Sequence, residues 1–189
     1  MNYKEMADTF SMDRRRLLFL LAKADEVLGE MNASLSIYVC GGANMCLYVG
    51  NSDSTSDINT APSDEDILRN PANRMQLLFN LPNNWLNPSG TIFVTGKMID
   101  ESVLGLNLNN LKVFFLSHKS MLVLKVLAAR HEMDSHDLHD TIALLKKLEI
   151  KKLSDINDLI NEYKPAWNNP FVLSFAKEAL ELAWGVEGK

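Results

Sequence analysis

The residues best suited to phosphate chemistry lie in the first third of the chain. Gly41 and Gly42 follow an apolar, strand-like segment and precede a short helical pattern. Two glycines in such a turn expose backbone N–H groups with no Cβ in the way, which suits the close approach of a phosphate. Asp57 lies fifteen residues after Gly42, where its carboxylate could hold a metal ion that bridges those phosphates. A glycine pair alone is also typical of a tight turn. An aspartate at such a position is, by itself, also typical of a capping residue.

A second candidate is Lys125, which lies inside an apolar helical pattern. It is the only charged residue between Lys119 and Arg130. A cation in such a helix reaches water along its own stem, pairs with an anion or loses its proton. Two interpretations follow: a lysine at the edge of the core that extends to solvent, or a side chain directed into a cleft, where it meets an acid or a ligand phosphate.

Two acids follow Lys125 at the start of the next helical pattern. Asp137 and Asp140 are three residues apart, so they share one helix face. They could contribute to a site, and Asp137 together with Asp134 could also simply cap the helix.

Two groups of basic residues have no evident local purpose. Arg14, Arg15 and Arg16 start a helical pattern, where cations oppose the helix dipole. They indicate either a solvated face or contact with an anion or a partner. Four lysines near a later helix end complement the dipole and could also attract RNA or an anionic protein: Lys146, Lys147, Lys151 and Lys152.

The elements that must position these residues can be read from hydrophobic periodicity. A helix capped by Ser11 is expected first, then a strand over 35–40, a short helix over 43–49 that Gly50 ends, and a strand over 57–60 closed by Pro62. Ser63 is expected to cap a helix, which Pro71 either interrupts or follows as the first turn of a second helix, and Trp85 to anchor the following loop. Strands are expected over 91–95 and 112–116, with 104–108 ambiguous, and helices over 118–130, 135–148, 154–163 and 170–184.

Composition and length indicate one globular α/β (α+β) protein. The 189 residues contain 47% hydrophobic and 23% charged residues. We expect an α/β core with an N-terminal helix over 1–116 and a helical subdomain packed on it over 117–189. The net charge of −5 disfavours a general nucleic-acid coat, and no segment is apolar enough to span a membrane. An N-terminus without an apolar stretch and two cysteines expected to be reduced, Cys40 and Cys46, predict a cytoplasmic protein.

The order of these motifs resembles a known family. Tyr38–Gly42, Thr55-Ser56-Asp57-Ile58-Asn59, the turn Leu81-Pro82-Asn83-Asn84-Trp85-Leu86-Asn87, Leu124–Arg130 and Asp137–Asp140 follow one another as in nucleotidyltransferase-like proteins. The chain is most similar to the DUF6036 group, which is related to the AbiEii toxins of type IV toxin–antitoxin systems. The resemblance covers roughly residues 34–145.

The resemblance implies a polymerase-β-like nucleotidyltransferase core with a small mixed sheet. In that family the glycine turn holds a nucleoside triphosphate (NTP), and an Asp-x-Asp pair binds two Mg²⁺ ions. Carried over to this chain, Gly41 and Gly42 would contact phosphates, Thr55 would shape the loop and Asp57 would be the first metal ligand. Lys125 and Asp137 would match a lysine and an aspartate placed beside the nucleotide.

One departure from the family pattern bears on activity. Asn59 occupies the position of the second acid, and an amide offers one neutral oxygen where a bridging carboxylate is needed. Two functions remain open. The protein could transfer a nucleoside monophosphate to RNA or to a protein hydroxyl with a weakened Mg²⁺ site. Alternatively, it could be a catalytically inactive binding protein that acts through a protein partner, in a toxin–antitoxin or phage-defence setting.

Overall fold

The computed structural model describes residues 10–128 and 136–185. The chain forms two compact units, and each is described by itself below. Unit 1 contains Met1–Val94 and Ser102–Phe115, and unit 2 contains Thr95–Glu101 and Leu116–Lys189. The expected division of the chain into domains 1–116 and 117–189 stays a prediction.

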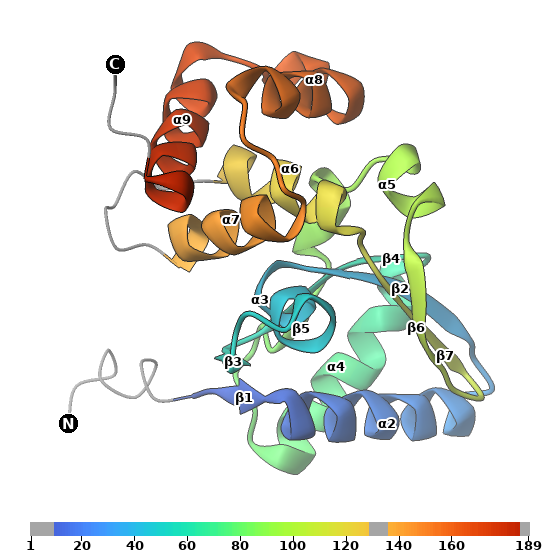
Figure 1. Ribbon diagram of the computed structural model, residues 1–189. Coiled ribbons are helices and arrows are strands. Elements are labelled where there is room, and N and C mark those ends of the chain that lie inside the picture. Colours follow the sequence, from blue (N-terminus) through green and yellow to red (C-terminus); the bar gives the residue numbers. More distant parts are fainter. Residues whose placement is uncertain (1–9, 129–135, 186–189) are drawn as a thin grey trace. The chain divides into compact units, whose positions relative to one another are not determined.

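Unit 1 is built on a mixed five-stranded sheet in the order β5-β4-β2-β7-β6 (Figure 1). The strands are β2 (Leu35–Cys40), β4 (Ile58–Pro62), β5 (Leu86–Asn87), β6 (Val103–Asn107) and β7 (Leu111–Phe115). The central strand β2 pairs with β4 in antiparallel orientation and with β7 in parallel orientation. The fold class expected from the sequence, an α/β protein with a small mixed sheet and a helical C-terminal half, is confirmed.

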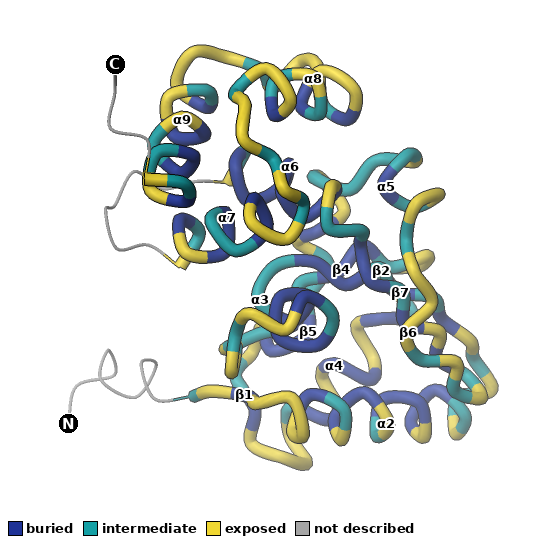
Figure 2. The backbone as a smooth tube through the Cα atoms, in the orientation of Figure 1, coloured by how far each residue is buried: buried dark blue, intermediate teal, exposed yellow. Residues whose placement is uncertain are grey.

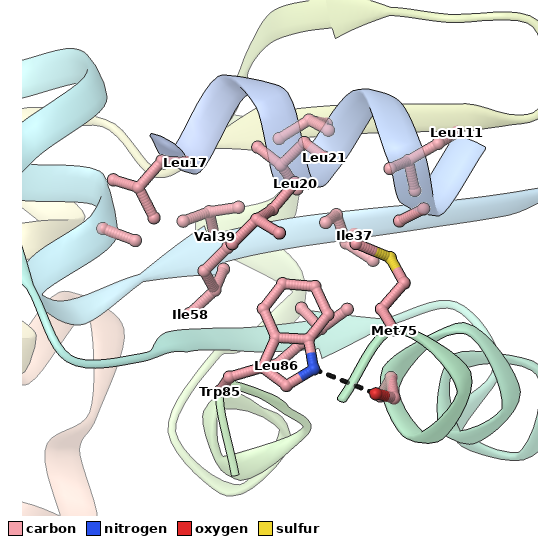
Figure 3. Packing of buried hydrophobic residues seen from close by; sticks show 14 of the residues in the cluster. Leu17, Leu20, Leu21, Ile37, Val39, Ile58, Met75, Trp85, Leu86 and Leu111 are labelled. Carbon is pink, nitrogen blue, oxygen red and sulfur yellow. Dashed lines mark hydrogen bonds between the residues drawn. The ribbon is translucent and has the colours of Figure 1, made fainter. Parts of the chain in front are cut away.

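One face of the sheet is covered by α2 (Arg14–Glu30) and α4 (Glu65–Phe79) (Figure 1). Strand β2 alternates in burial, so that Leu35, Ile37 and Val39 all project toward the core, as a half-buried strand requires. Trp85 is fully buried in this core and donates from Nε1 to the carbonyl of Ala72 at 2.9 Å (Figure 3). The expectation that Trp85 anchors its loop is therefore confirmed.

The caps of α2 and α4 differ from those expected, and α4 does not end at its proline. The cap of α2 is Asp13, whose carboxylate accepts from the amide of Arg16, so the prediction of Ser11 as the cap was wrong. Asp64, one residue after the expected Ser63, caps α4. This helix also runs through Pro71, which is buried, and packing of that face maintains the helix despite the missing N–H.

The segment after β2 is helical as expected. Gly41–Asn44 (α3) is followed by a π-helical turn over Met45–Val49 (η1), and Gly50 ends it with a φ of 76°. A short two-stranded ladder joins β1 (Met12–Asp13) to β3 (Ser54–Thr55), which places the loop after η1 beside the start of α2. The glycine turn and the loop that carries Thr55 are therefore held in one region of unit 1.

The expected strand over 91–95 is wrong. Ser89–Ile92 form a 3₁₀ helix (η2), and Thr95 caps the short helix α5 (Gly96–Asp100). The tight packing of Gly90 explains this, because a Cβ there would lie 2.7 Å from the backbone of Thr60. The close approach needs a glycine and fixes a turn where β-branched composition alone had indicated a strand. The ambiguous segment 104–108 falls largely within β6.

The described part of unit 2 contains α5 and four longer helices. These are α6 (His118–Ala128), α7 (His136–Lys147), α8 (Leu153–Tyr163) and α9 (Pro170–Trp184), and the 3₁₀ helix η3 (Pro165–Trp167) links the last two. All four correspond to expected helices, and α9 matches its expected bounds. The interpretation of Asp134 as a cap lies outside the described residues.

Two expectations about the chain's chemistry can be compared with the structure. Cys40 and Cys46 are buried thiols that are not joined in a disulfide, as expected. Within residues 10–128 and 136–185, no helix is long and apolar enough to cross a membrane. The N-terminal residues used to argue against a signal peptide lie outside the described residues.

Candidate functional site

The structure brings the five unit 1 residues singled out from the sequence into one cluster at the end of β2. Gly41 has a φ of +62°, the left-handed conformation that favours glycine. A Cβ at Gly41 would lie 3.1 Å from Asn59 Nδ2, and one at Gly42 would lie 2.5 Å from Thr55 Oγ1. The glycine turn is thus packed directly against both polar side chains. This spacing explains why both positions lack a Cβ.

Strand pairing and a local hydrogen bond place Asp57 at the same turn. Asn59 pairs in register with Cys40, the residue before the glycines, so the start of β4 runs beside the end of β2. Thr55 Oγ1 donates to the carbonyl of Asp57 at 3.1 Å, which fixes the loop immediately before the strand. Asp57 and Asn59 are both half-buried. Their side chains can therefore contact protein and ligand at the same time.

Asn59 makes hydrogen bonds with both polar atoms of its side chain. Its Nδ2 donates to Asp57 Oδ1 at 3.2 Å, and its Oδ1 accepts from Ser89 Oγ at 2.6 Å. The amide is therefore integrated into the cluster, where it donates to one oxygen of the Asp57 carboxylate. Sequence reasoning missed Ser89, because it precedes the segment that was wrongly expected to be a strand. No local pattern connected it with Asn59, thirty residues earlier.

The donor set of this cluster fits one Mg²⁺ ion and does not fit two. Among the described residues, no group of three or more Asp, Glu, His or Cys side chains is arranged to hold a metal. Mg²⁺ is commonly held by one or two carboxylates together with substrate phosphates and water, which Asp57 alone could support. A two-metal centre needs carboxylates that bridge the ions. Asn59 cannot bridge two ions as a carboxylate does.

In unit 2, Lys125 of α6 is held by two carboxylates of α7. Its Nζ lies 2.8 Å from Asp137 Oδ1 and 2.7 Å from Asp140 Oδ2. The side chains of Lys125 and Asp140 are each only 10% exposed, whereas that of Asp137 is 23% exposed. Of the alternatives left open by the sequence, Lys125 pairs with anions and does not extend to solvent.

The electrostatics of this cluster follow from its burial. Burial by itself lowers the pKa of Lys125, but the nearby carboxylates, Asp140 first and then Asp137, reverse that effect and raise the pKa. Lys125 is therefore a stable cation, and the three charges sum to −1. Asp137 also accepts at its backbone carbonyl from Thr141 Oγ1 at 2.7 Å, which fixes the first turn of α7.

Sequence reasoning recognised that Asp137 and Asp140 share a helix face but selected only Asp137 as a site residue. The signal for Asp140 was available. A buried lysine with two acids at a helical spacing of three can contact both, whichever of them faces a ligand. Asp140 is the more buried of the two acids, and its Oδ2 forms an ion pair with Lys125.

Comparisons with known proteins give one structural similarity. No family model matches the sequence, and no curated protein matches it either. Among solved structures, an antigenic nucleotidyltransferase-like protein from Paracoccidioides brasiliensis aligns with 93% of this chain and 100% of its own length. The TM-score is 0.48 and the sequence identity is 15%, and we transfer no residue roles from it.

Proposed function

We propose that this protein transfers a nucleoside monophosphate from an NTP to a hydroxyl group of RNA or of a protein. The observation that carries the proposal is the unit 1 cluster. There, a Cβ-free turn after a buried strand packs directly against Thr55 and Asn59, with Asp57 beside them. This arrangement combines accessible backbone N–H groups with one half-buried carboxylate, which is the chemistry that a metal-bound triphosphate requires.

In this proposal unit 1 binds the nucleotide. The backbone of Gly41 and Gly42 lies against the phosphates, and Asp57 contributes one ligand to a single Mg²⁺ ion. The ion, when bound, offsets the negative charge of the phosphates. Ser89 and Thr55 hold Asn59 and the Asp57 loop in place through the hydrogen bonds described above. Preorganised groups of this kind need little rearrangement when the ligand binds.

The proposed transfer forms one bond at the α-phosphorus and breaks another. The acceptor hydroxyl oxygen forms a bond to the α-phosphorus, the bond from that phosphorus to the bridging oxygen breaks, and pyrophosphate leaves. The hydroxyl proton passes to a general base or to water. The resemblance placed Lys125 and Asp137 beside the nucleotide, and the role of Asp137 as that base stays a prediction. Within unit 2, the ion pair with Lys125 holds Asp137 in position.

The direct test is label transfer from α-labelled NTPs to RNA or protein in the presence of Mg²⁺ or Mn²⁺. We expect the wild type to transfer label, and Asp57→Ala to abolish transfer without loss of folding. Asp53→Ala is the matched control, since Asp53 is an exposed acid in the same loop and has no proposed role. If all four NTPs give no transfer to either acceptor class, or if Asp57→Ala retains full activity, the proposal fails.

A second candidate is a protein that binds a nucleotide without turnover. The observation that favours it is the engagement of both polar atoms of Asn59, which leaves Asp57 as the single carboxylate of the cluster. In this case NTP with Mg²⁺ raises the melting temperature although no label is transferred. Asn59→Asp separates the two candidates, because a second carboxylate should create or raise activity only where the missing acid limits catalysis. The toxin–antitoxin or phage-defence setting stays a prediction.

A further inference from the structure

The outward face of α2 in unit 1 carries an ordered pattern of charge that the proposed function does not use. The buried residues of this helix lie on the opposite side, and Figure 2 shows buried and exposed positions alternating along it. The outward face is formed by residues at helical spacings of three, four and seven: Arg15, Arg16, Phe19, Ala22, Lys23, Glu26 and Glu30. We refer to these seven residues as the α2 face.

Charge on the α2 face is divided along the helix. Arg15 and Arg16 lie in its first turn, and Glu26 and Glu30 lie near its end. Both groups oppose the helix dipole, which favours acids at the start and cations at the end. The dipole does not explain this order, and the ion pairs that the glutamates form within the chain, Lys23–Glu26 and Arg74–Glu30, lie on the surface, where such pairs stabilise the fold little. An interaction outside the chain would account for it.

Contacts within unit 1 account for only part of the arginine run noted in the sequence. Arg14 donates to the carbonyl of Leu47 at 2.7 Å, and Arg16 lies over the ring of Phe10 at 4.7 Å. Arg15 is exposed, and its guanidinium forms no hydrogen bond or ion pair with the described residues. The arginine run therefore still presents positive charge to solvent.

The middle of the α2 face carries two apolar residues. Phe19 is 46% exposed and meets the ring of Phe79 edge-on, with centroids 5.6 Å apart. Phe79 belongs to the end of α4, where Leu78 is also exposed. Ala22, a small exposed residue near the midpoint of α2, would allow another helix to approach closely. The face thus has a basic end, a middle that carries Phe19 and Ala22 together with Lys23, and an acidic end.

We propose that the α2 face binds the α2 face of a second copy of this chain, with the two helices antiparallel. A two-fold axis near Ala22 would place Arg15 of each copy opposite Glu30 of the other, bring the two Ala22 residues together, and set Phe19 against the methylene groups of Glu26. A two-fold contact makes every favourable pair twice, so a face with opposite charge at its two ends is complementary to itself only in this orientation. This proposal is independent of the proposed nucleotide chemistry.

The size of the α2 face limits the expected affinity of the dimer. Seventeen residues of helix span about 25 Å, and one such helix pair buries less than the roughly 1,200 Å² of standard interfaces. The intrachain pairs Lys23–Glu26 and Arg74–Glu30 are on the surface and must partly exchange for contacts with the second copy. We therefore expect a dimer that forms on the order of 10–100 μM and weakens as salt is added.

Sedimentation equilibrium with charge-reversed chains tests the proposal. We expect the wild type to dimerise, and both Arg15→Glu/Arg16→Glu and Glu26→Lys/Glu30→Lys to be monomeric alone, because the two ends of each face then carry the same sign of charge. Mixing the two variants should restore a 1:1 dimer. Phe19→Ser should also weaken the wild-type dimer at least tenfold.

The control is Lys119→Glu/Lys152→Glu, which changes the net charge as much as the arginine variant does. Both lysines are exposed near helix starts in unit 2, where acids are tolerated. This control should dimerise like the wild type. A wild type that stays monomeric at several hundred micromolar overturns the proposal. Variants that dimerise alone, a mixture that does not pair, or binding only to an acidic peptide also overturn it. Circular dichroism confirms that each variant is folded.

Discussion

The two clusters of candidate site residues are built on opposite principles. In unit 1, the cluster residues come from adjacent strand ends and are joined by side-chain hydrogen bonds at half-buried positions: Gly41, Gly42, Thr55, Asp57 and Asn59. In unit 2, one buried cation joins two helices through ion pairs to two acids. The first cluster depends on close backbone packing, and the second depends on charge balance.

This difference predicts which cluster tolerates change. Removing one member of a buried ion group leaves the remaining charges without compensation, and that penalty is large. Removing a hydrogen bond at a partly exposed position lowers the stability much less, whereas adding atoms to the glycine turn disrupts its close packing. The unit 2 cluster should therefore be sensitive to the removal of a charged group, and the unit 1 cluster to the addition of side-chain atoms.

The largest effect is expected for Lys125→Met. The substitution leaves Asp140 buried beside Asp137 with no cation, and we expect a loss of about 3–5 kcal/mol in the free energy of unfolding. Urea denaturation measures it. The control is Lys177→Met, which removes the exposed pair with Glu181 and should cost about 0–1 kcal/mol. Equal losses in the two variants would show that the Lys125 cluster is not a buried ion group.

The stability that Lys125 contributes should depend on pH in one direction. The pKa of Lys125 is raised because its carboxylate partners outweigh the opposing effect of burial, so the folded state holds this proton more tightly than the unfolded state. The stability that it contributes is complete below the ordinary lysine pKa of 10.5 and is lost as pH rises through the higher folded value. The difference in unfolding free energy between wild type and Lys125→Met should therefore be constant near neutral pH and shrink above 10.5. A difference that shrinks below pH 9 would contradict this direction.

In unit 1 the largest effect is expected for Gly42→Ala. The new Cβ would lie 2.5 Å from Thr55 Oγ1 and 3.0 Å from Thr55 Cβ, and we expect a cost of about 1–3 kcal/mol in unfolding free energy. Thr55→Ala in the same chain should recover part of it by removing the closer atom. Gly96→Ala is the control, because nothing lies within 4 Å of its added Cβ. If both alanines are tolerated equally, the turn is looser than described.

The smallest effect is expected for Asn59→Asp without metal. The new carboxylate would lose the hydrogen bond to Asp57 Oδ1 and repel that group, so we expect a loss of about 1 kcal/mol in unfolding free energy. Mg²⁺ or Mn²⁺ should reverse this loss and raise the melting temperature more than in wild type. Thermal unfolding with and without the cation measures both. The same cation response in Asn59→Asp and Asp57→Ala would exclude a metal site at this pair.

Much of the local structure could be predicted from the sequence. Hydrophobic periodicity located β2 and all four of the longer unit 2 helices, and Gly50 ends η1 as expected. These elements depend on neighbouring residues, whose pattern is visible in the chain. The failures at 91–95 and at Pro71 came from tertiary packing, since Gly90 fits against Thr60 and the buried face of α4 maintains its helix.

The sequence by itself determined which residue types were available: a glycine pair, one acid followed by an amide, and a lysine among apolar neighbours with two acids after it. Only the tertiary structure decided what each of them contacts. Ser89 reaches Asn59, and both Asp137 and Asp140 reach Lys125, across separations that no local pattern records. The physical reason is that helix and strand formation follow local periodicity, whereas hydrogen bonds and ion pairs between distant segments depend on how those elements pack.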